Sequence, residues 1–75
     1  MSSKISSTPR VFIVKNFEDV EDCVNCLEQI HSIIVNLSSL EISNRYRIVD
    51  FLSGYIYARK GYREKLESNI YMFSL

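Results

Sequence analysis

The sequence has few of the residues that interrupt regular structure or cross-link small folds. Its 75 residues include two glycines, one proline, two cysteines and no tryptophan. Two cysteines, Cys23 and Cys26, are too few for a disulfide framework and favour a reducing compartment. Because 47% of the residues are hydrophobic, the chain is also not a low-complexity or disordered polymer. These absences indicate one small globular domain with an ordinary apolar core.

The chain also lacks an excess of charge and a long apolar run. Nine Lys and Arg residues balance nine Asp and Glu residues, which argues against a nucleic-acid partner held by bulk electrostatics. No run of ~18 apolar residues could span a bilayer, and residues 1–9 lack the apolar core of a secretory signal. We expect residues 1–9 to be a disordered tail and residues 10–75 to be the folded domain. A domain this short buries only about 60% of its unfolded surface, so we also expect self-association.

Residues that carry catalysis or hold cofactors are equally scarce. His31 is the only histidine, and no serine or cysteine lies at a spacing from it that would indicate a nucleophilic triad. Gly54 and Gly61 do not form a phosphate-binding loop. The C-x-x-C of Cys23 and Cys26 falls inside a predicted helix without a second pair, so we expect these thiols to pack beside its apolar stripe. We expect no enzymatic activity, no cofactor and no metal site.

Short apolar runs and helical periodicity predict the first half of the fold. Residues 11–14 and 33–37 are nearly continuous apolar runs, which are typical of strands covered on both faces. Between them, Asn16 is expected to cap a helix whose apolar residues recur from Phe17 to Ile30. Strand, helix and strand in so short a stretch imply a parallel crossover.

The second half predicts a longer helix and a hairpin. Ser43 is expected to cap a helix over residues 44–60, and Gly61 to end it. Residues 62–67 and 70–73 follow as two strands joined by a tight turn. The sequence therefore predicts an α/β fold of the α+β sandwich type, in the order βαβαββ, with two helices packed on one small mixed sheet.

The helix over residues 44–60 has more apolar side chains than one core needs. We therefore expect it to cover the sheet with one face and to meet a partner with another. Gly54 lies in its middle, where Gly is about 1 kcal/mol less favourable than Ala. Close approach of another backbone would explain this glycine better than an accident of evolution.

Charged and aromatic residues of the second half form a further pattern. All six charged residues between 16 and 42 are acidic, whereas six of the nine from 43 onward are basic. This separation indicates either two solvated faces or a basic rim that receives a peptide carrying carboxylates. Tyr71 and Phe73 point to the same face of the last strand, with Lys65 expected nearby on its neighbour. The aromatic pair is either core, an oligomer contact or a platform for RNA bases.

One run of the chain resembles the signature of the SepF family of cell-division proteins, namely RIVDFLSG at residues 47–54 followed by YIYA at residues 55–58. Val35-Asn36-Leu37 and Ile70-Tyr71-Met72 are similar to two strands of that family, so the resemblance covers residues 10–75. It implies a cytoplasmic adaptor at the division site, or in an organelle stroma, that dimerises and polymerises. Its partner would be the C-terminal tail of the tubulin-like protein FtsZ, and its role to support Z-ring assembly or membrane tethering during septum formation.

The resemblance also implies site residues. The family's dimer contact falls on Phe51 and Gly54, and we expect Ile48 and Tyr55 to join them. The family's FtsZ-tail pocket falls on Lys65 and Tyr71, where Tyr71 replaces the usual Phe, and we include Phe73. Tyr62 replaces the usual Asp.

Family members normally begin with a membrane-binding amphipathic helix, for which residues 1–9 have too few apolar side chains. We therefore expect the membrane to be reached only indirectly or not at all. Two other classes remain open. One is a nucleic-acid-binding module that uses Tyr71, Phe73 and the late basic residues. The other is a small structural subunit without a peptide pocket.

Overall fold

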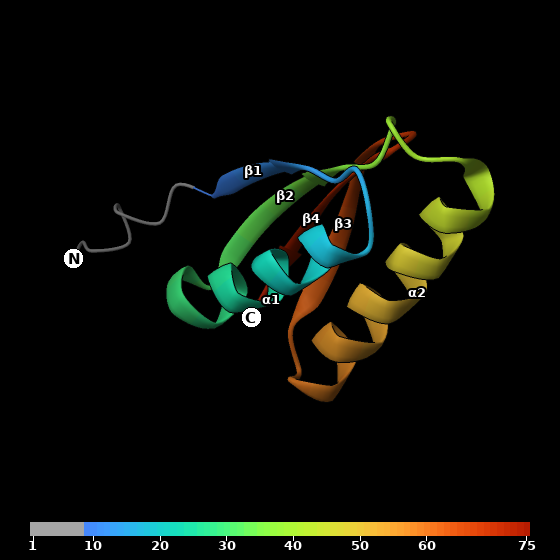
Figure 1. Ribbon diagram of the computed structural model, residues 1–75. Helices are drawn as coiled ribbons and strands as arrows, with labels where there is room; N and C mark the ends of the chain where they lie inside the picture. Colours follow the sequence, from blue (N-terminus) through green and yellow to red (C-terminus); the bar gives the residue numbers. More distant parts are fainter. Residues whose placement is uncertain (1–8) are drawn as a thin grey trace.

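Six elements follow one another in the order that the sequence predicts. The computed structural model describes residues 9–75, so the tail expected over residues 1–9 lies outside the described residues except for Pro9. The elements are β1 (Arg10–Ile13), α1 (Glu18–Ile30), β2 (Ser32–Asn36), α2 (Ile42–Ala58), β3 (Tyr62–Glu67) and β4 (Ile70–Ser74) (Figure 1). The order βαβαββ and the α+β class are thereby confirmed.

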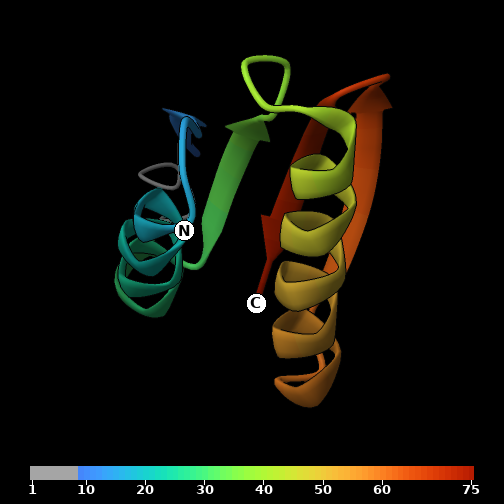
Figure 2. The ribbon, with the colours of Figure 1, turned by 45° about the vertical axis from the view of Figure 1, so that its right-hand side comes forward.

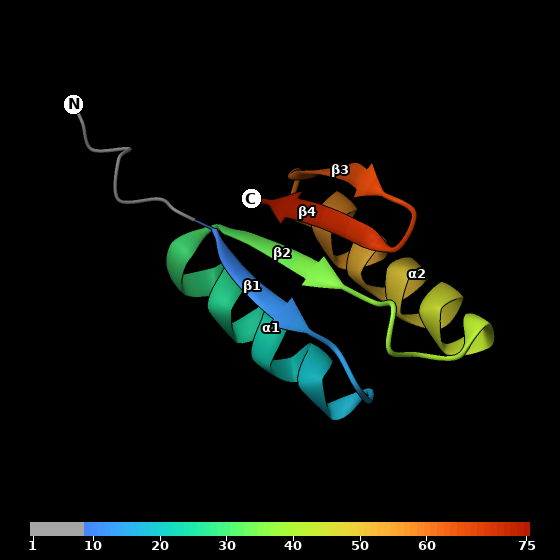
Figure 3. The ribbon, with the colours of Figure 1, turned by 90° about the horizontal axis from the view of Figure 1, so that it is seen from above.

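The strands form one mixed sheet in the order β1-β2-β4-β3. β1 runs parallel to β2, which is the crossover expected from a strand–helix–strand unit. β4 is antiparallel to both β2 and β3, and it lies inside the sheet although it is the last strand in the sequence (Figure 3). The pairing of β3 with β4 is irregular between Lys65 and Glu67.

Both helices cover the same face of the sheet, as the views in Figures 2 and 3 agree. The expectation that the first strands are covered on both faces is therefore wrong. Phe12 and Val14 point toward the helices, whereas Val11 and Ile13 point to the other face and are 59% and 56% exposed. A continuous apolar run fits either arrangement, because alternate residues of a strand face opposite sides. The second face of the sheet is left open by the described residues.

The core lies between the sheet and the two helices. Phe73 of β4 is the largest of its fully buried side chains, with Leu27 of α1, Ile33 of β2 and Leu52 of α2 around it. Cys23 also packs in this core, as predicted. Burial, with Asp19, Asp22 and Cys26 nearby, raises the pKa of its thiol from 9.0 to about 12. The Cys23 thiol is therefore neutral and unreactive at ordinary pH.

The start of each helix differs in how its first N–H groups are satisfied. The Asn16 side chain accepts a hydrogen bond from the Asp19 N–H at 3.2 Å, while the Asp19 carboxylate accepts one from the Lys15 N–H at 2.8 Å. The N-cap position of α1 is Phe17, not Asn16 as predicted, but the Asn16 side chain still accepts a bond from an N–H of the first turn. The prediction for Ser43 is wrong, because α2 already begins at Ile42 and Ser43 lies within its first turn.

The residues that follow α2, Lys60 and Gly61, have different roles from those that the sequence suggests. Lys60, with φ of 62°, adopts the left-handed conformation that was expected of a glycine. The N–H groups of Lys60 and Gly61 donate to the carbonyls of Tyr57 and Ile56 at 3.0 and 2.9 Å. Gly61 is needed for another reason, since a Cβ there would collide with the carbonyl oxygen of Ser74. The chain therefore turns from α2 into β3 directly against the end of β4.

Candidate functional site

A cleft opens between α2 and the β3–β4 hairpin, and we call it the hairpin cleft. It has a volume of about 190 Å³. Its lining residues come from α2, from the hairpin and from the loop before α2, and they are Leu37, Ile42, Arg45, Tyr46, Val49, Lys65, Ser68, Asn69 and Tyr71. Two of the three predicted tail-binding residues, Lys65 and Tyr71, therefore line one cleft.

Strand pairing brings these two side chains together. Lys65 of β3 is the direct cross-strand partner of Tyr71 in β4, and paired residues on neighbouring strands share a face. Tyr71 is half-buried and stacks on Phe73 at 6.1 Å between ring centroids. The Arg63 guanidinium lies 5.7 Å from the Tyr71 ring and donates to the Ser53 hydroxyl at 2.9 Å. Tyr71 is therefore held in place by neighbours on its own sheet.

Phe73, the third predicted tail-binding residue, does not reach the cleft. It is 0% exposed, and its ring is part of the core between β2 and the helices. The sequence placed it correctly on the same face as Tyr71, but β4 is an inner strand and Phe73 packs in the core cluster with residues of both helices. Phe73 stacks against the Tyr71 ring but offers no surface to a ligand in this structure.

Arg45 is a cleft residue that the sequence indicated only as one of six basic residues of a possible rim and not as a site residue. Its Nε donates to the Leu40 carbonyl at 2.8 Å, and its Nη1 donates to Asn69 Oδ1 at 3.3 Å. Since the Leu37 N–H also donates to the Asn69 carbonyl at 2.8 Å, these bonds join the loop before α2 to the turn of the hairpin. A signal existed in the sequence, because Arg45 stands at helical spacing from the apolar residues Ile48 and Leu52.

The predicted dimer residues of α2 fall into two groups. Ile48 is 1% exposed and belongs to the core, so it offers no surface to a partner in this structure. Phe51 is 46% exposed, and Gly54 is also exposed, since a Cβ at this position would have no neighbour from the described residues within 4 Å. Tyr57, about one turn further along, is 85% exposed. We call Phe51, Gly54, Tyr57 and Ala58 the outer face of α2.

Tyr55, the fourth predicted dimer residue, engages its own chain. Its hydroxyl donates to the Glu28 carboxylate, which also receives the Arg59 guanidinium in an ion pair. This cluster ties the end of α1 to the end of α2. Because the Glu28 and Arg59 side chains are nearly half exposed, the ion pair adds little to stability.

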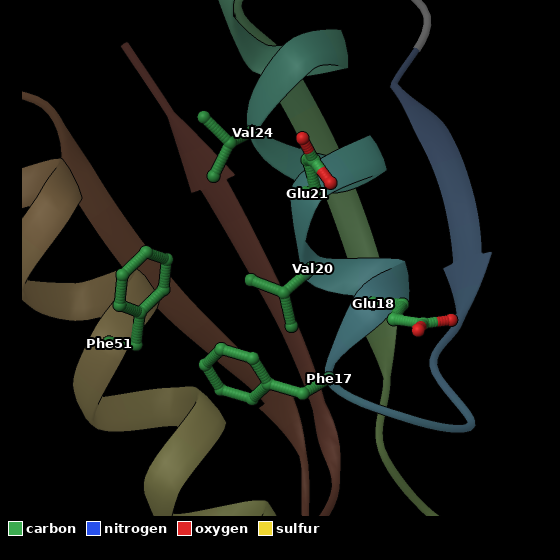
Figure 4. A pocket seen from close by; sticks show the side chains of 6 residues that line it. All are labelled: Phe17, Glu18, Val20, Glu21, Val24 and Phe51. Atoms are coloured by element: carbon green, nitrogen blue, oxygen red, sulfur yellow. The ribbon is translucent and has the colours of Figure 1, made fainter.

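An apolar groove of about 420 Å³ separates the start of α1 from α2 (Figure 4). Phe17, directly before α1, and Val20 and Val24 of α1 point across it toward Phe51 of α2, whereas Glu18 points away. The rings of Phe17 and Phe51 meet edge to face at 5.8 Å. The groove adjoins the outer face of α2, so apolar surface continues from one helix to the other.

Metal-binding and membrane-spanning features are absent from residues 9–75. They contain no cluster of three or more His, Cys, Asp or Glu side chains that could hold a metal ion. Within the same residues, neither helix is long and apolar enough to cross a membrane.

Comparison with known proteins gives one consistent family. The family model described as Cell division protein SepF matches residues 10–74. The Cell division protein SepF of Oenococcus oeni is 37% identical over 73 residues, which cover 97% of this chain and 41% of that protein. Its counterpart in Clostridium tetani is 38% identical over 71 residues, covering 92% of this chain and 46% of the relative.

A more distant relative, the Cell division protein SepF of Synechococcus elongatus, is 28% identical over 72 residues. These residues cover 93% of this chain and 38% of that protein, so the chain spans less than half the length of the relatives it matches. The matched region contains all six elements of the fold, the hairpin cleft and the outer face of α2. The chain therefore belongs to the SepF family of cell division proteins.

Proposed function

We propose that this chain is a division-site adaptor that binds the C-terminal tail of FtsZ in the hairpin cleft and works as a homodimer. The observation that carries the proposal is the meeting of Lys65 and Tyr71 in one cleft. These are the residues on which the family resemblance places the tail pocket, and they are paired across two strands. Support also comes from the names of the relatives, which are cell division proteins.

The chemistry of the cleft suits a peptide with both acidic and apolar residues. Lys65 and Arg45 contribute positive charge, and none of the lining residues is acidic. Leu37, Ile42 and Val49 add apolar walls. Peptide sites of this kind gain affinity from the apolar contacts and specificity from a few placed polar groups.

The homodimer is supported by the surroundings of Gly54. A glycine inside a helix is about 1 kcal/mol less favourable than alanine, and among residues 9–75 no side chain or neighbouring element lies close enough to require one there. A second copy of α2 packed against the outer face would use the missing side chain, because small residues let two helices approach closely. Phe51 and Tyr57, which flank Gly54, would then leave water on dimerisation.

The alternative of a nucleic-acid-binding module is weakened, because one of its two proposed stacking residues is not accessible. It requires Tyr71 and Phe73 to stack bases, but Phe73 is fully buried and Tyr71 is half-buried against it. We therefore favour a protein-binding role without catalysis.

Fluorescence anisotropy of a labelled FtsZ C-terminal tail peptide, titrated with the protein, tests the proposed function. Lys65→Ala and Tyr71→Ala should each weaken binding by about tenfold or more, since each removes a contact from the middle of the site. Lys15→Ala and Tyr62→Ala are matched controls, because both side chains are exposed and lie outside the cleft. The controls should bind as the wild type does.

Circular dichroism of all four variants must show the native helix content for the comparison to hold. A folded wild-type protein that fails to bind the peptide would contradict the proposal. So would equal losses in the control and cleft variants, because they would point to general electrostatics and not to this cleft.

A further inference from the structure

Arg45 differs from every other Lys and Arg among residues 9–75 in its burial. The remaining basic side chains of this part of the chain are exposed, whereas Arg45 is half-buried at the wall of the hairpin cleft. Placing a guanidinium away from water is unfavourable unless an anion or several hydrogen bonds compensate for it. The partners of Arg45 therefore show whether its charge is already balanced.

The partners of Arg45 within the chain are neutral. The Leu40 carbonyl and the Asn69 side-chain oxygen each accept one hydrogen bond from it. The one ion pair found among the described residues joins Arg59 to Glu28, at the other end of α2. A guanidinium has five N–H donors, so donors remain for a further acceptor. Arg45 is thus fixed in position without a carboxylate from the described part of its own chain.

The cleft around Arg45 favours an anionic group over a neutral one. Lys65 lines the same cleft from the hairpin side, so two positive charges face a space that no acidic residue lines. The Arg45 guanidinium is held in place by its two hydrogen bonds, whereas the Lys65 ammonium lies at the end of a long, flexible and exposed side chain. A planar, pre-oriented guanidinium suits the two oxygens of a carboxylate, to which Lys65 adds a mobile second charge.

The apolar wall beside Arg45 restricts the ligand further. Ile42 and Val49 lie about one helical turn before and after Arg45 and line the cleft with it. A free small anion would gain nothing from these side chains. A peptide with an acidic residue beside an apolar one would use both the charges and the wall.

We infer that Arg45 is a ligand-binding residue of the hairpin cleft, which takes the carboxylate of an acidic residue next to an apolar residue in a bound peptide. Lys65 is the second cation for the same carboxylate. The inference deepens the proposed function, on which it rests, because it states which chemistry of the bound tail this chain recognises. Its failure and the failure of FtsZ binding are nevertheless separate outcomes.

The first experiment is a double-mutant cycle that combines Arg45→Gln in the protein with an altered FtsZ-tail peptide. In the altered peptide each Asp or Glu is replaced by Asn or Gln. Arg45→Gln keeps an amide donor for the neutral acceptors and removes the charge. Wild-type protein should lose at least about tenfold in affinity for the neutral peptide, whereas Arg45→Gln, which keeps only the Lys65 charge, should bind the acidic peptide more weakly and discriminate between the two peptides several-fold less. Arg45→Lys should recover part of the loss.

Arg47→Gln is the matched control. Arg47 lies two residues along the same helix, carries the same charge, is exposed and is not part of the cleft. Its replacement should change the affinity less than about twofold. Equal losses in Arg45→Gln and Arg47→Gln would overturn the inference, because the net charge of the helix would then explain binding.

The second experiment does not depend on FtsZ. The side-chain Nε–H signal of Arg45 is followed by NMR during titration with acetyl-Leu-Asp-Leu-amide, and with acetyl-Leu-Asn-Leu-amide as the neutral counterpart. The acidic peptide should shift the Arg45 signal and the neutral one should not. The backbone spectrum of Arg45→Gln shows in the same experiment whether the variant is folded.

The two experiments separate the possible failures. If the acidic tripeptide shifts the Arg45 signal but the FtsZ tail does not bind, the inference stands and the proposed function falls. If the FtsZ tail binds wild type and a folded Arg45→Gln alike, the inference falls and the proposed function stands. If neither peptide binds, both are wrong.

Discussion

The two glycines of this chain are present for opposite reasons. Gly61 is required inside the protomer, because any side chain there would collide with the backbone of Ser74. Gly54 is not required by any contact with the described part of the chain, since a Cβ there would meet nothing within 4 Å, although the glycine weakens the helix in which it lies. The sequence shows that Gly54 lies inside a helix and that Gly61 follows it, but the collision at Gly61 and the open space at Gly54 are visible only in the structure.

Alanine substitutions at the two glycines should therefore change stability in opposite directions. Gly61→Ala should lower the free energy of unfolding by about 3 kcal/mol, since the Ser74 carbonyl is backbone and cannot move aside cheaply. Gly54→Ala should raise it by about 0.5–1 kcal/mol, because the position is exposed and alanine favours the helix. Urea unfolding at low protein concentration measures both. The same sign for both variants would contradict this account.

At the scale of elements, the sequence identifies every helix and strand but not which way each of them faces. Helical spacing in α2 is compatible with several orientations, because apolar residues surround much of the helix. The stripe that contains Ile48, Leu52 and Ile56 packs on the sheet, and only the structure shows that Ile48 is core and Phe51 is not. For the hairpin the sequence predicts more, since strand alternation alone places Lys65 near Tyr71.

The outer face of α2 gives a prediction about assembly. Gly54→Lys places a long charged side chain where a second α2 is proposed to pack, so the variant should be monomeric in multi-angle light scattering. Ser43→Lys is the control, because Ser43 is exposed on the same helix but about three turns away. It should keep the mass of the wild type. A Gly54→Lys variant with unchanged mass would exclude this face as the dimer contact.

At the scale of the whole molecule, the hairpin cleft and the core meet at β4. Tyr71 lines the cleft and Phe73, two residues later, is the largest fully buried side chain among the described residues. The sequence could not separate these roles, because both residues are aromatic and point to the same face of one strand. The difference is one of burial, since Phe73 packs in the core cluster with residues of both helices, whereas Tyr71 is only half-buried and lines the cleft.

Substitutions of Phe73 should therefore affect folding and not recognition. Phe73→Ala should lower the free energy of unfolding by about 3–5 kcal/mol, a loss that a domain of this size does not survive well. Phe73→Leu should lose less than about 1.5 kcal/mol and bind the FtsZ tail peptide as the wild type does. Thermal unfolding and anisotropy on the same samples provide the two values. Weakened binding by a stable Phe73→Leu protein would restore Phe73 as a contact.

The position of β4 also determines when the protein can fold during synthesis. β4 is the last of the six elements to be made, but it joins β2 to β3 in the sheet. Until residue 74 has left the ribosome, the growing chain has one strand pair at its start and a lone strand at its other end, with no central strand between them. The hairpin cleft is incomplete until Tyr71 has emerged as well. If the hairpin cleft binds a peptide as proposed, a nascent chain would be unable to bind it before the sheet is closed.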